Sequence, residues 1–279
     1  MQLALWMFLL TAMLATLWSP DGQAEPVTYW HTVHQPILGA PRIIGSYASG
    51  CLQGAQSLPS DGPGFRTMRR HRGRFFGHPA LVRYIQELGR QVAEKNGGVL
   101  NISDLGQARG GPIPSGHRSH QTGLDVDIWF WLTDDVEPLA AATRETVSAP
   151  SMLTADAQGL NPQVWTSRQI HLLQTAAGFA AVERIFVNPH IKQALCKHFA
   201  GAAWLRKIRP WWGHDAHFHV RLRCPNGNPS CVKQAPPPSG DGCDATLAWW
   251  FTAEAQTPPK KDTEEEIKLP AACQAILDK

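Results

Sequence analysis

Residues 115–130, SGHRSHQTGLDVDIWF, decide how this sequence is interpreted. From Leu124 onward, apolar residues alternate with other residues at period two, which predicts a β-strand with Asp125 and Asp127 on one face. Two carboxylates on a buried strand are costly unless they meet cations, a metal ion or hydrogen-bond donors. His117 and His120 lie just upstream, in a loop flanked by glycine and serine. The stretch therefore predicts a strand that carries part of a polar site.

Residues 211–222, WWGHDAHFHVRL, show the same alternation, with His217, His219 and Arg221 on one face. Alternate residues of a strand lie about 6.5–7 Å apart on one face, so one histidine could bind a metal while the other reaches an atom bound to it. We interpret the pair 211–212 at the start of the stretch as core, with a binding platform as the alternative.

Two strands that each offer carboxylate or imidazole groups suggest one shared site. Two histidines and one carboxylate are a common ligand set for catalytic zinc, with water in the open position. Asp125 could orient a ligand imidazole, although a hydrogen-bonding role at a strand end fits it equally well. A hydrogen-bonded cluster of histidine and aspartate without metal is the alternative for the whole site. The remaining histidines are interpreted as surface or core residues: His31, His34, His71, His78, His171, His190 and His198.

The overall composition describes a folded globular protein. The chain has 279 residues, of which 43% are hydrophobic and 18% are charged, with 11 Trp and 10 Phe. These values exclude collagen, coiled coils and disordered chains. The formal net charge of +3 comes without a dense Lys/Arg stripe, so we expect no nucleic-acid partner.

Residues 1–24 have the pattern of a signal peptide. An apolar run from Leu3 to Trp18 is too short for a comfortable membrane span, and Gly22-Gln23-Ala24 has the small-x-small form that signal peptidase prefers. We expect cleavage after Ala24, export to the periplasm and no stable membrane insertion afterwards. No Lys or Arg precedes the apolar run, and an uncleaved membrane anchor is the alternative.

The six cysteines are interpreted as three disulfides. None lies in residues 1–24 and none forms a Cys-x-x-Cys pair, which argues against zinc or redox chemistry at cysteine. Cys224 and Cys231 are seven apart across a turn-rich loop that one bond could close. Spacing leaves the other partners open, since six cysteines allow 15 pairings.

Residues 25–279 are expected to form one α+β domain, with a small antiparallel sheet that carries the site, flanking helices, many loops and disulfide staples. Hydrophobic periodicity predicts helices over 78–95, 167–181 and 190–199, and strands over 99–102 and 182–187. For the second helix we expect an N-cap at Ser167 and an apolar side formed by Ile170, Leu173, Ala177 and Ala180. We expect residues 25–76 to be dominated by loops and the charged, Pro-rich segment 257–268 to be a solvated linker.

Two spacings make the sequence resemble a known group of metallopeptidases. His-x6-Asp, from His120 to Asp127, followed far downstream by His-x-His at 217 and 219, resembles the clan of lysostaphin, D-Ala-D-Ala peptidase and hedgehog-type zinc metallopeptidases. Longer strings at 115–128, 184–189 (RIFVNP), 219–225 (HVRLRCP) and 237–243 (PPSGDGC) are similar to the penicillin-insensitive murein endopeptidase family. The similarity runs from about Gly45 to residue 279.

The resemblance implies a periplasmic zinc DD-endopeptidase that hydrolyses D-alanyl–meso-diaminopimelyl cross-bridges, so the implied partner is peptidoglycan. His120, Asp127 and His219 match the zinc ligands, and His117 matches a further residue at the metal site. His217 matches the second active-site imidazole, a general base for metal-activated water. The remaining match is His214, a histidine that lines the cleft and that, like His117, could help to stabilise the oxyanion.

The resemblance also implies disulfides Cys51–Cys273, Cys196–Cys243 and Cys224–Cys231. Family members can carry an Asp-x-x-His pair for a second zinc ion; Asp156 matches the acid but Gly159 replaces the histidine, so we expect no second site. Two other functions remain as alternatives. One is a non-catalytic peptidoglycan-binding protein with structural zinc, and the other is a metal-dependent hydrolase of another bond.

Overall fold

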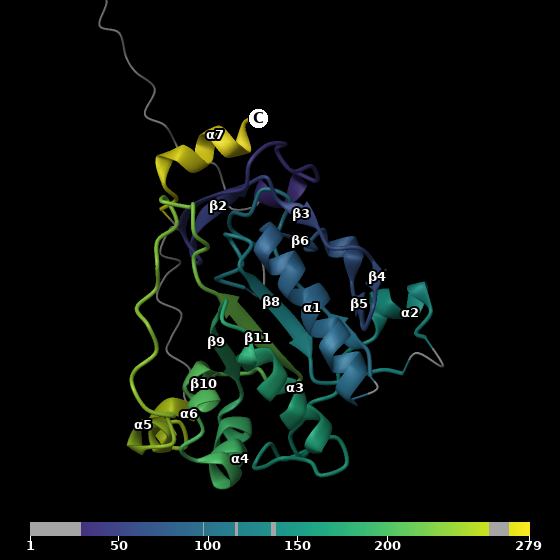
Figure 1. The fold of residues 1–279 in the computed structure, drawn as a ribbon, viewed down its shortest axis with the longest axis vertical. Helices are drawn as coiled ribbons and strands as arrows, with labels where there is room; N and C mark the ends of the chain where they lie inside the picture. The colour runs from purple at the N-terminus through teal and green to yellow at the C-terminus, as the bar shows by residue number, and fades with distance from the viewer. Residues whose placement is uncertain (1–28, 97, 115–116, 135–137, 257–267) are drawn as a thin grey trace, which may run out of the picture.

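The computed structural model describes residues 29–96, 98–114, 117–134, 138–256 and 268–279. Its centre is a seven-stranded sheet in the order β10-β9-β11-β8-β7-β5-β4 (Figure 1). These strands are β4 (Asp61–Gly62), β5 (Phe65–Thr67), β7 (Leu100–Ile102), β8 (Asp125–Trp129), β9 (Val182–Val187), β10 (Ile208–Pro210) and β11 (His217–Leu222).

The middle of this sheet is antiparallel, as expected, because β11 pairs with β8 on one side and with β9 on the other. The sheet is extended by two parallel pairs, β10 with β9 and β5 with β7. The first parallel pair arises because helix α4 (Pro189–Phe199) forms a crossover between β9 and β10.

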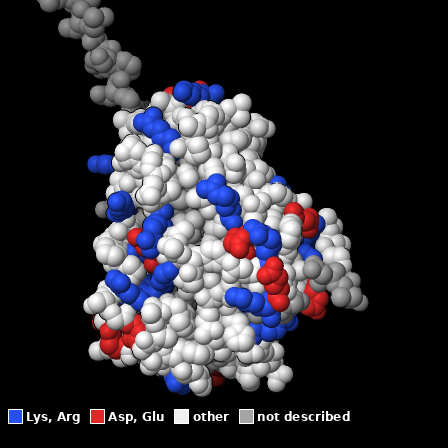
Figure 2. Space-filling view, viewed as in Figure 1, with Lys and Arg blue, Asp and Glu red and all other residues white. Residues whose placement is uncertain are grey.

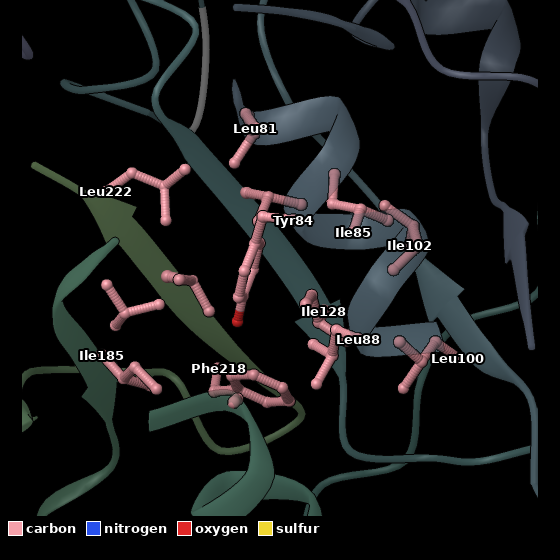
Figure 3. Close-up of a cluster of buried hydrophobic side chains, with 14 of the residues drawn as sticks. Leu81, Tyr84, Ile85, Leu88, Leu100, Ile102, Ile128, Ile185, Phe218 and Leu222 are labelled. Carbon is pink, nitrogen blue, oxygen red and sulfur yellow. The ribbon is translucent and has the colours of Figure 1, made fainter. Parts of the chain in front are cut away.

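Two helices, α1 (Pro79–Asn96) and α3 (Ser167–Gly178), pack on one face of the sheet. Side chains of α1 such as Leu81, Ile85 and Leu88 meet the strand residues Ile128 and Phe218 there (Figure 3). Most apolar members of the two alternating stretches are fully or almost fully buried on this face, whereas Ala216 is half-buried. The buried members are Leu124, Val126, Ile128, Phe130, Phe218, Val220 and Leu222. Period two therefore leaves the opposite face of β8 and β11 for polar side chains.

Short elements surround this core. Two small antiparallel sheets pair β1 (Arg42–Ser46) with β2 (Ser49–Gln53) and β3 (Gln56–Ser57) with β6 (Phe76–Gly77). The remaining helices are α2 (Ala141–Thr146), α5 (Ala245–Trp249), α6 (Ala253–Gln256), α7 (Gln274–Leu277) and the 3-10 helices η1 (Trp30–Thr32), η2 (Arg70–Arg72), η3 (Ala203–Lys207) and η4 (Ala271–Cys273). Among the described helices, none has the length and apolar character needed to span a bilayer.

The predicted helices and strands are confirmed, with α1, α4, β7 and β9 within about two residues of their expected bounds. The helix predicted over 167–181 ends at Gly178, because Phe179 turns into extended backbone that leads to β9. Its N-cap is Thr166, not Ser167: Thr166 Oγ1 accepts from the N–H of Arg168, and the Thr166 N–H donates to Gln169 Oε1 at 3.0 Å.

The buried face of α3 also differs from the expected one. It consists of Gln169, Leu172, Leu173, Ala176 and Ala177, whereas Ile170 is half-buried and Ala180 lies beyond the helix and is exposed.

The structure contains the three disulfides that the resemblance implied. Cys51–Cys273 joins β2 to η4 across 222 positions, Cys196–Cys243 joins α4 to the segment before α5, and Cys224–Cys231 closes the loop after β11. The expected signal peptide, residues 1–24, and nearly all of the charged segment 257–268 lie outside the described residues. On the face seen in Figure 2, Lys and Arg side chains are interspersed with Asp and Glu.

Candidate metal centre

The two alternating stretches become directly paired strands. In the antiparallel register of β8 and β11, His219 lies opposite Asp127 and Arg221 lies opposite Asp125. The sequence predicted that the two stretches share a site, and strand pairing is the physical reason that they do. All residues of β8 are buried, so the carboxylates face a closed polar interior rather than open solvent.

His120 reaches this interior from a tight turn just before β8. Its backbone has a positive φ of 70°, and Gly123 follows with φ of 66°, where a Cβ would come within 2.8 Å of the backbone nitrogen of His78. The side chain of Gln121 fixes the turn: its Oε1 accepts from the N–H of Gly50 in β2, and its Nε2 donates to the carbonyl of Ala48. The β1–β2 hairpin therefore supports the turn that presents His120.

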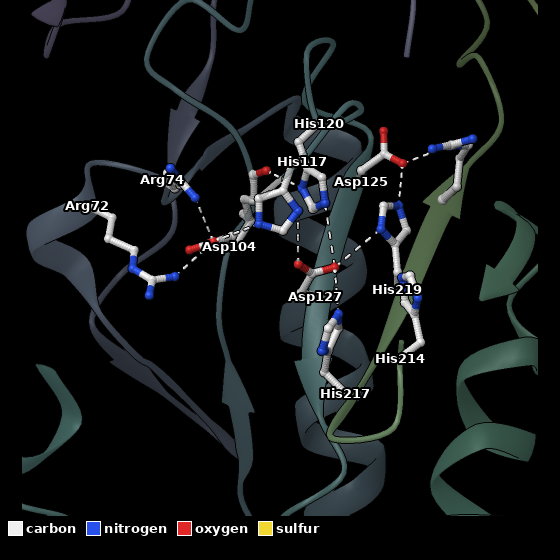
Figure 4. Close-up of polar contacts among 12 residues, drawn as sticks. Arg72, Arg74, Asp104, His117, His120, Asp125, Asp127, His214, His217 and His219 are labelled. Carbon is white, nitrogen blue, oxygen red and sulfur yellow. Dashed lines mark hydrogen bonds and ion pairs between the residues drawn. The ribbon is translucent and has the colours of Figure 1, made fainter. Parts of the chain in front are cut away.

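Four histidines converge on Asp127 (Figure 4). Asp127 Oδ1 lies 3.5 Å from Nε2 of His120 and 3.3 Å from Nδ1 of His219. The same oxygen lies 3.8 Å from Nε2 of His217, and Oδ2 lies 3.6 Å from Nδ1 of His117. One triple, His117, His120 and Asp127, offers ligand atoms that all lie within 4.8 Å of one another. His219 completes the group from the neighbouring strand.

Two buried atoms of this group have no hydrogen-bond partner among the described residues: Asp127 Oδ1 and His120 Nε2. His120 Nδ1 lies 2.5 Å from the carbonyl oxygen of Leu105, which can only accept, so the ring proton is on Nδ1 and Nε2 presents a lone pair. Burial alone would raise the pKa of Asp127, but the His120 and His217 imidazoles hold it well below its ordinary value. A buried carboxylate facing nitrogen lone pairs fits a zinc ion, which prefers such ligands.

Asp125 orients His219 through the ring nitrogen that faces away from Asp127. Its Oδ1 lies 2.6 Å from Nε2 of His219, so that nitrogen donates and Nδ1 is directed toward Asp127. Arg221 donates from Nε to the same oxygen at 2.6 Å. Burial would raise the pKa of Asp125, but Arg221 and His219 lower it below its ordinary value, so it is an anion. This contact favours the orienting role, which the sequence left as one of two alternatives for Asp125.

Asp104 orients His117 as Asp125 orients His219. The sequence analysis did not identify Asp104. Asp104 Oδ2 lies 2.9 Å from Nε2 of His117 and also accepts from Arg72 at 3.2 Å and Arg74 at 3.1 Å. Burial would raise the pKa of Asp104, but its hydrogen bond with His117 and the nearby Arg74 lower it. Asp104 stands alone after β7, outside both alternating stretches, so no spacing in the sequence marks it.

His217 and His214 lie at the more accessible side of the group, with ring centroids 5.0 Å apart. Burial lowers the pKa of His217 against the opposing effect of Asp127, which favours a neutral ring. Burial and the neighbouring His217 and His219 lower the pKa of His214 to about 3. His214 Nδ1 lies 2.7 Å from the carbonyl oxygen of Trp212, so in the neutral ring Nε2 presents a lone pair, not an N–H.

The other seven histidines have no recorded contact with Asp127 in the part of the chain that the structure describes. His71 pairs with Glu145 at the surface, and His78 Nδ1 accepts from the N–H of Ala80 at the start of α1. Asp156, which matched a residue of the family's second zinc site, accepts from Thr154 Oγ1 within an exposed local turn.

Comparison with known proteins places the chain in a family. Residues 43–278 match the family model described as penicillin-insensitive murein endopeptidase. Curated proteins of that name are 45% identical in Klebsiella pneumoniae, 41% in Pectobacterium atrosepticum and 41% in Salmonella heidelberg. Each alignment covers 96% of this chain and 94–97% of the relative.

This similarity spans nearly the full length of this chain and of each relative, and the range matched by the family model contains the positions of the candidate metal centre. Because this family consists of enzymes, the chain is an enzyme and not the non-catalytic peptidoglycan-binding protein considered as an alternative. The chain belongs to the penicillin-insensitive murein endopeptidases and is a peptide hydrolase that acts on peptidoglycan.

Proposed function

We propose that this enzyme is a zinc-dependent DD-endopeptidase that hydrolyses the D-alanyl–meso-diaminopimelyl cross-bridge between peptidoglycan stem peptides. The observation that carries the proposal is the buried pair of unpartnered atoms, Asp127 Oδ1 and His120 Nε2, with His219 Nδ1 beside them. The choice of cross-bridge follows from the resemblance to the family.

His120 Nε2, the Asp127 carboxylate and His219 Nδ1 would hold the zinc ion, with His117 Nδ1 as a further nitrogen at the site. Three protein ligands leave a position for water, an arrangement typical of catalytic rather than structural zinc. When bound, zinc lowers the pKa of water to about 7 and polarises a peptide carbonyl.

His217 is the proposed general base. It is neutral because burial lowers its pKa, and its Nε2 faces the metal centre at 3.8 Å from Asp127. Nε2 accepts the proton of the water that attacks the D-alanyl carbonyl and returns it to the leaving amine. Its side chain is 31% exposed, the most accessible of the imidazoles that converge on Asp127, so water and substrate can reach it.

For His214 we propose a different role from that of the oxyanion donor that the resemblance suggested. A neutral ring whose Nδ1 donates to the Trp212 carbonyl has no N–H at Nε2. We propose that Nε2 of His214 accepts a hydrogen bond from a substrate N–H and so orients the peptide beside His217.

The test uses purified mature protein and cross-linked muropeptide dimers, with and without a chelator, with products identified by mass. We expect conversion to monomers by cleavage at the D-alanyl bond, loss of this activity after chelation and its return with added zinc. Cleavage that persists in chelator would refute zinc dependence, and products cut at another bond would refute the proposed specificity.

Two substitutions distinguish the proposed zinc ligand His120 from the proposed general base His217. His120→Ala should lose both zinc and activity, whereas His217→Ala should keep zinc but lower kcat by about 100-fold or more, the usual contribution of a positioned base. His198→Ala, at an exposed histidine outside the site, is the control. Zinc content measured by atomic spectroscopy decides between the roles: a zinc-free His217→Ala protein would make His217 a ligand.

We also propose that the chain is exported to the periplasm with cleavage after Ala24 and that residues 25–279 act there as one domain. The pairing of all six cysteines in three disulfides supports an oxidising compartment. The intact mass of protein from a periplasmic extract should correspond to a chain that begins at Glu25. A full-length mass in the membrane fraction would instead support an uncleaved anchor.

A further inference from the structure

Four tryptophans form a cluster beside the metal centre: Trp211, Trp212, Trp249 and Trp250. Neighbouring ring centroids in this tryptophan cluster are 4.6–6.1 Å apart. The sequence interpretation of the pair 211–212 as core is wrong for Trp211, which is 47% exposed, while Trp212 is half-buried. The exposed half of the Trp211 ring is therefore free to contact a ligand beside the candidate site.

Strand alternation places Trp211 on the face of the sheet that carries the site. In the parallel pair β9 and β10, the buried residue Pro210 lies opposite Val187, which is also buried. Trp211 is the next residue, and its N–H donates to the carbonyl of Val187 at 2.9 Å, so the alternation turns its side chain to the opposite face. Phe186 lies on that same face because it precedes Val187.

Phe186 links Trp211 to the metal centre. It lies opposite His219 in the register of β9 and β11, with ring centroids 5.3 Å apart. The ring of Trp211 packs edge-on against Phe186 at 5.7 Å. Trp211 is therefore two ring contacts from a proposed zinc ligand.

The structure holds the tryptophan cluster firmly. Trp212 Nε1 donates to the carbonyl of Ala255 in α6 at 2.5 Å, and Trp249 Nε1 donates to Glu254 at 3.3 Å. The disulfide Cys196–Cys243 ties the segment that leads into α5 to helix α4. The exposed ring of Trp211 thus rests on a fixed base, which reduces the entropy lost when a ligand binds.

We propose that Trp211 is a sugar-binding platform that stacks against an N-acetylated hexosamine of the glycan strand to which the cleaved stem peptide is attached. A pyranose ring has an apolar C–H face that packs on an aromatic ring while its hydroxyls stay in water, which suits a half-exposed tryptophan. A stem peptide of three or four extended residues spans about 10–13 Å. The two ring contacts of 5.7 Å and 5.3 Å place Trp211 within that span of His219. The inference rests on the proposed function, because it assigns the position of the glycan relative to that site.

The experiment compares two substrates: cross-linked muropeptide dimers that carry their disaccharides, and the same cross-linked peptides after enzymatic removal of the sugars. For wild type, kcat/KM should be higher with the sugar-bearing dimer. Trp211→Ala should lower the ratio of the two kcat/KM values by roughly 10-fold, as expected for one aromatic contact, whereas Trp211→Tyr should keep most of the ratio. Tyr29→Ala, at another exposed aromatic residue, is the matched control and should leave the ratio unchanged.

Equal losses on both substrates in Trp211→Ala would overturn the proposal and indicate a contact with the peptide. Unchanged kcat/KM values for both substrates would overturn it as well. Binding of the free disaccharide, followed by tryptophan fluorescence of the full mature chain, is independent of catalysis. Disaccharide binding that is lost in Trp211→Ala would support the platform even if chelation showed that the zinc mechanism is wrong, so the two proposals fail separately.

Discussion

Asp125 is a fully buried anion that does not face the proposed zinc position but orients His219, which does. Its carboxylate fixes the proton of His219 on Nε2 and is itself fixed by Arg221, which also stacks over the ring of Tyr47 with its guanidinium carbon 3.6 Å from the ring centroid. Nδ1 of His219 is thus directed toward Asp127.

Asp125→Asn should therefore weaken zinc binding by about 10–100-fold, because an amide oxygen is a weaker acceptor for the His219 N–H and leaves Arg221 without its anion. Competition with a chromophoric chelator measures the change. Asp156→Asn, at an exposed aspartate in a local turn, is the control. Zinc affinity that is the same in Asp125→Asn and wild type would show that Asp125 does not act through His219.

His78 predicts a pH dependence of stability. Its Nδ1 accepts from the Ala80 N–H, its Nε2 has no partner among the described residues, and burial together with Arg83 lowers its pKa from 6.5 to about 4. Because the folded state disfavours the charged ring, the contribution of His78 is complete above pH 6.5 and is lost as the pH falls toward about 4.

Denaturant unfolding of wild type and His78→Asn at pH 7.5 and pH 4.5 tests this. Asparagine can accept from the same N–H but does not titrate, so the variant should lose less stability on acidification. Equal losses in the two proteins would assign the acid sensitivity to other groups.

At the scale of elements, the N-terminus of α3 offers a matched pair of substitutions. Thr166 forms the capping box with Gln169, whereas Ser167, the residue that the sequence suggested, is the first residue inside the helix. Thr166→Ala should lower the free energy of unfolding by about 1 kcal/mol, and Ser167→Ala should change it little. Thermal unfolding should show the Tm of Thr166→Ala about 2–4 °C lower. A larger effect at Ser167 would contradict the observed cap.

Elements with a strong period could be predicted from the sequence, and so could the residues that they bring together. The alternation around Asp127 and His219 predicted both strands of the site, because a strand places every second side chain on one face. Asp104 could not be predicted in this way, since its contact with His117 depends on how the chain after β7 packs beside the turn before β8. The exposure of Trp211 likewise depends on where β10 ends at the sheet edge, which no local pattern determines.

At the scale of the whole molecule, the disulfides should differ in their contribution to stability. Cys51–Cys273 closes a separation of 222 positions and Cys224–Cys231 one of 7. If the bonds act by restricting the unfolded chain, removing the first by paired Cys→Ala substitutions should cost about 3 kcal/mol more than removing the second. Denaturant unfolding of the two double variants measures this, and equal costs would show that native-state effects dominate.

The long disulfide has a further consequence for when the enzyme becomes active. Cys51 lies in β2 beside Gly50, whose N–H holds Gln121 and hence the turn that presents His120. The hairpin that supports this turn gains its covalent anchor only after 222 further residues have been synthesised and the two thiols have been oxidised. We therefore expect a nascent or reduced chain to hold the His120 turn less firmly, and to be less active, than the oxidised enzyme.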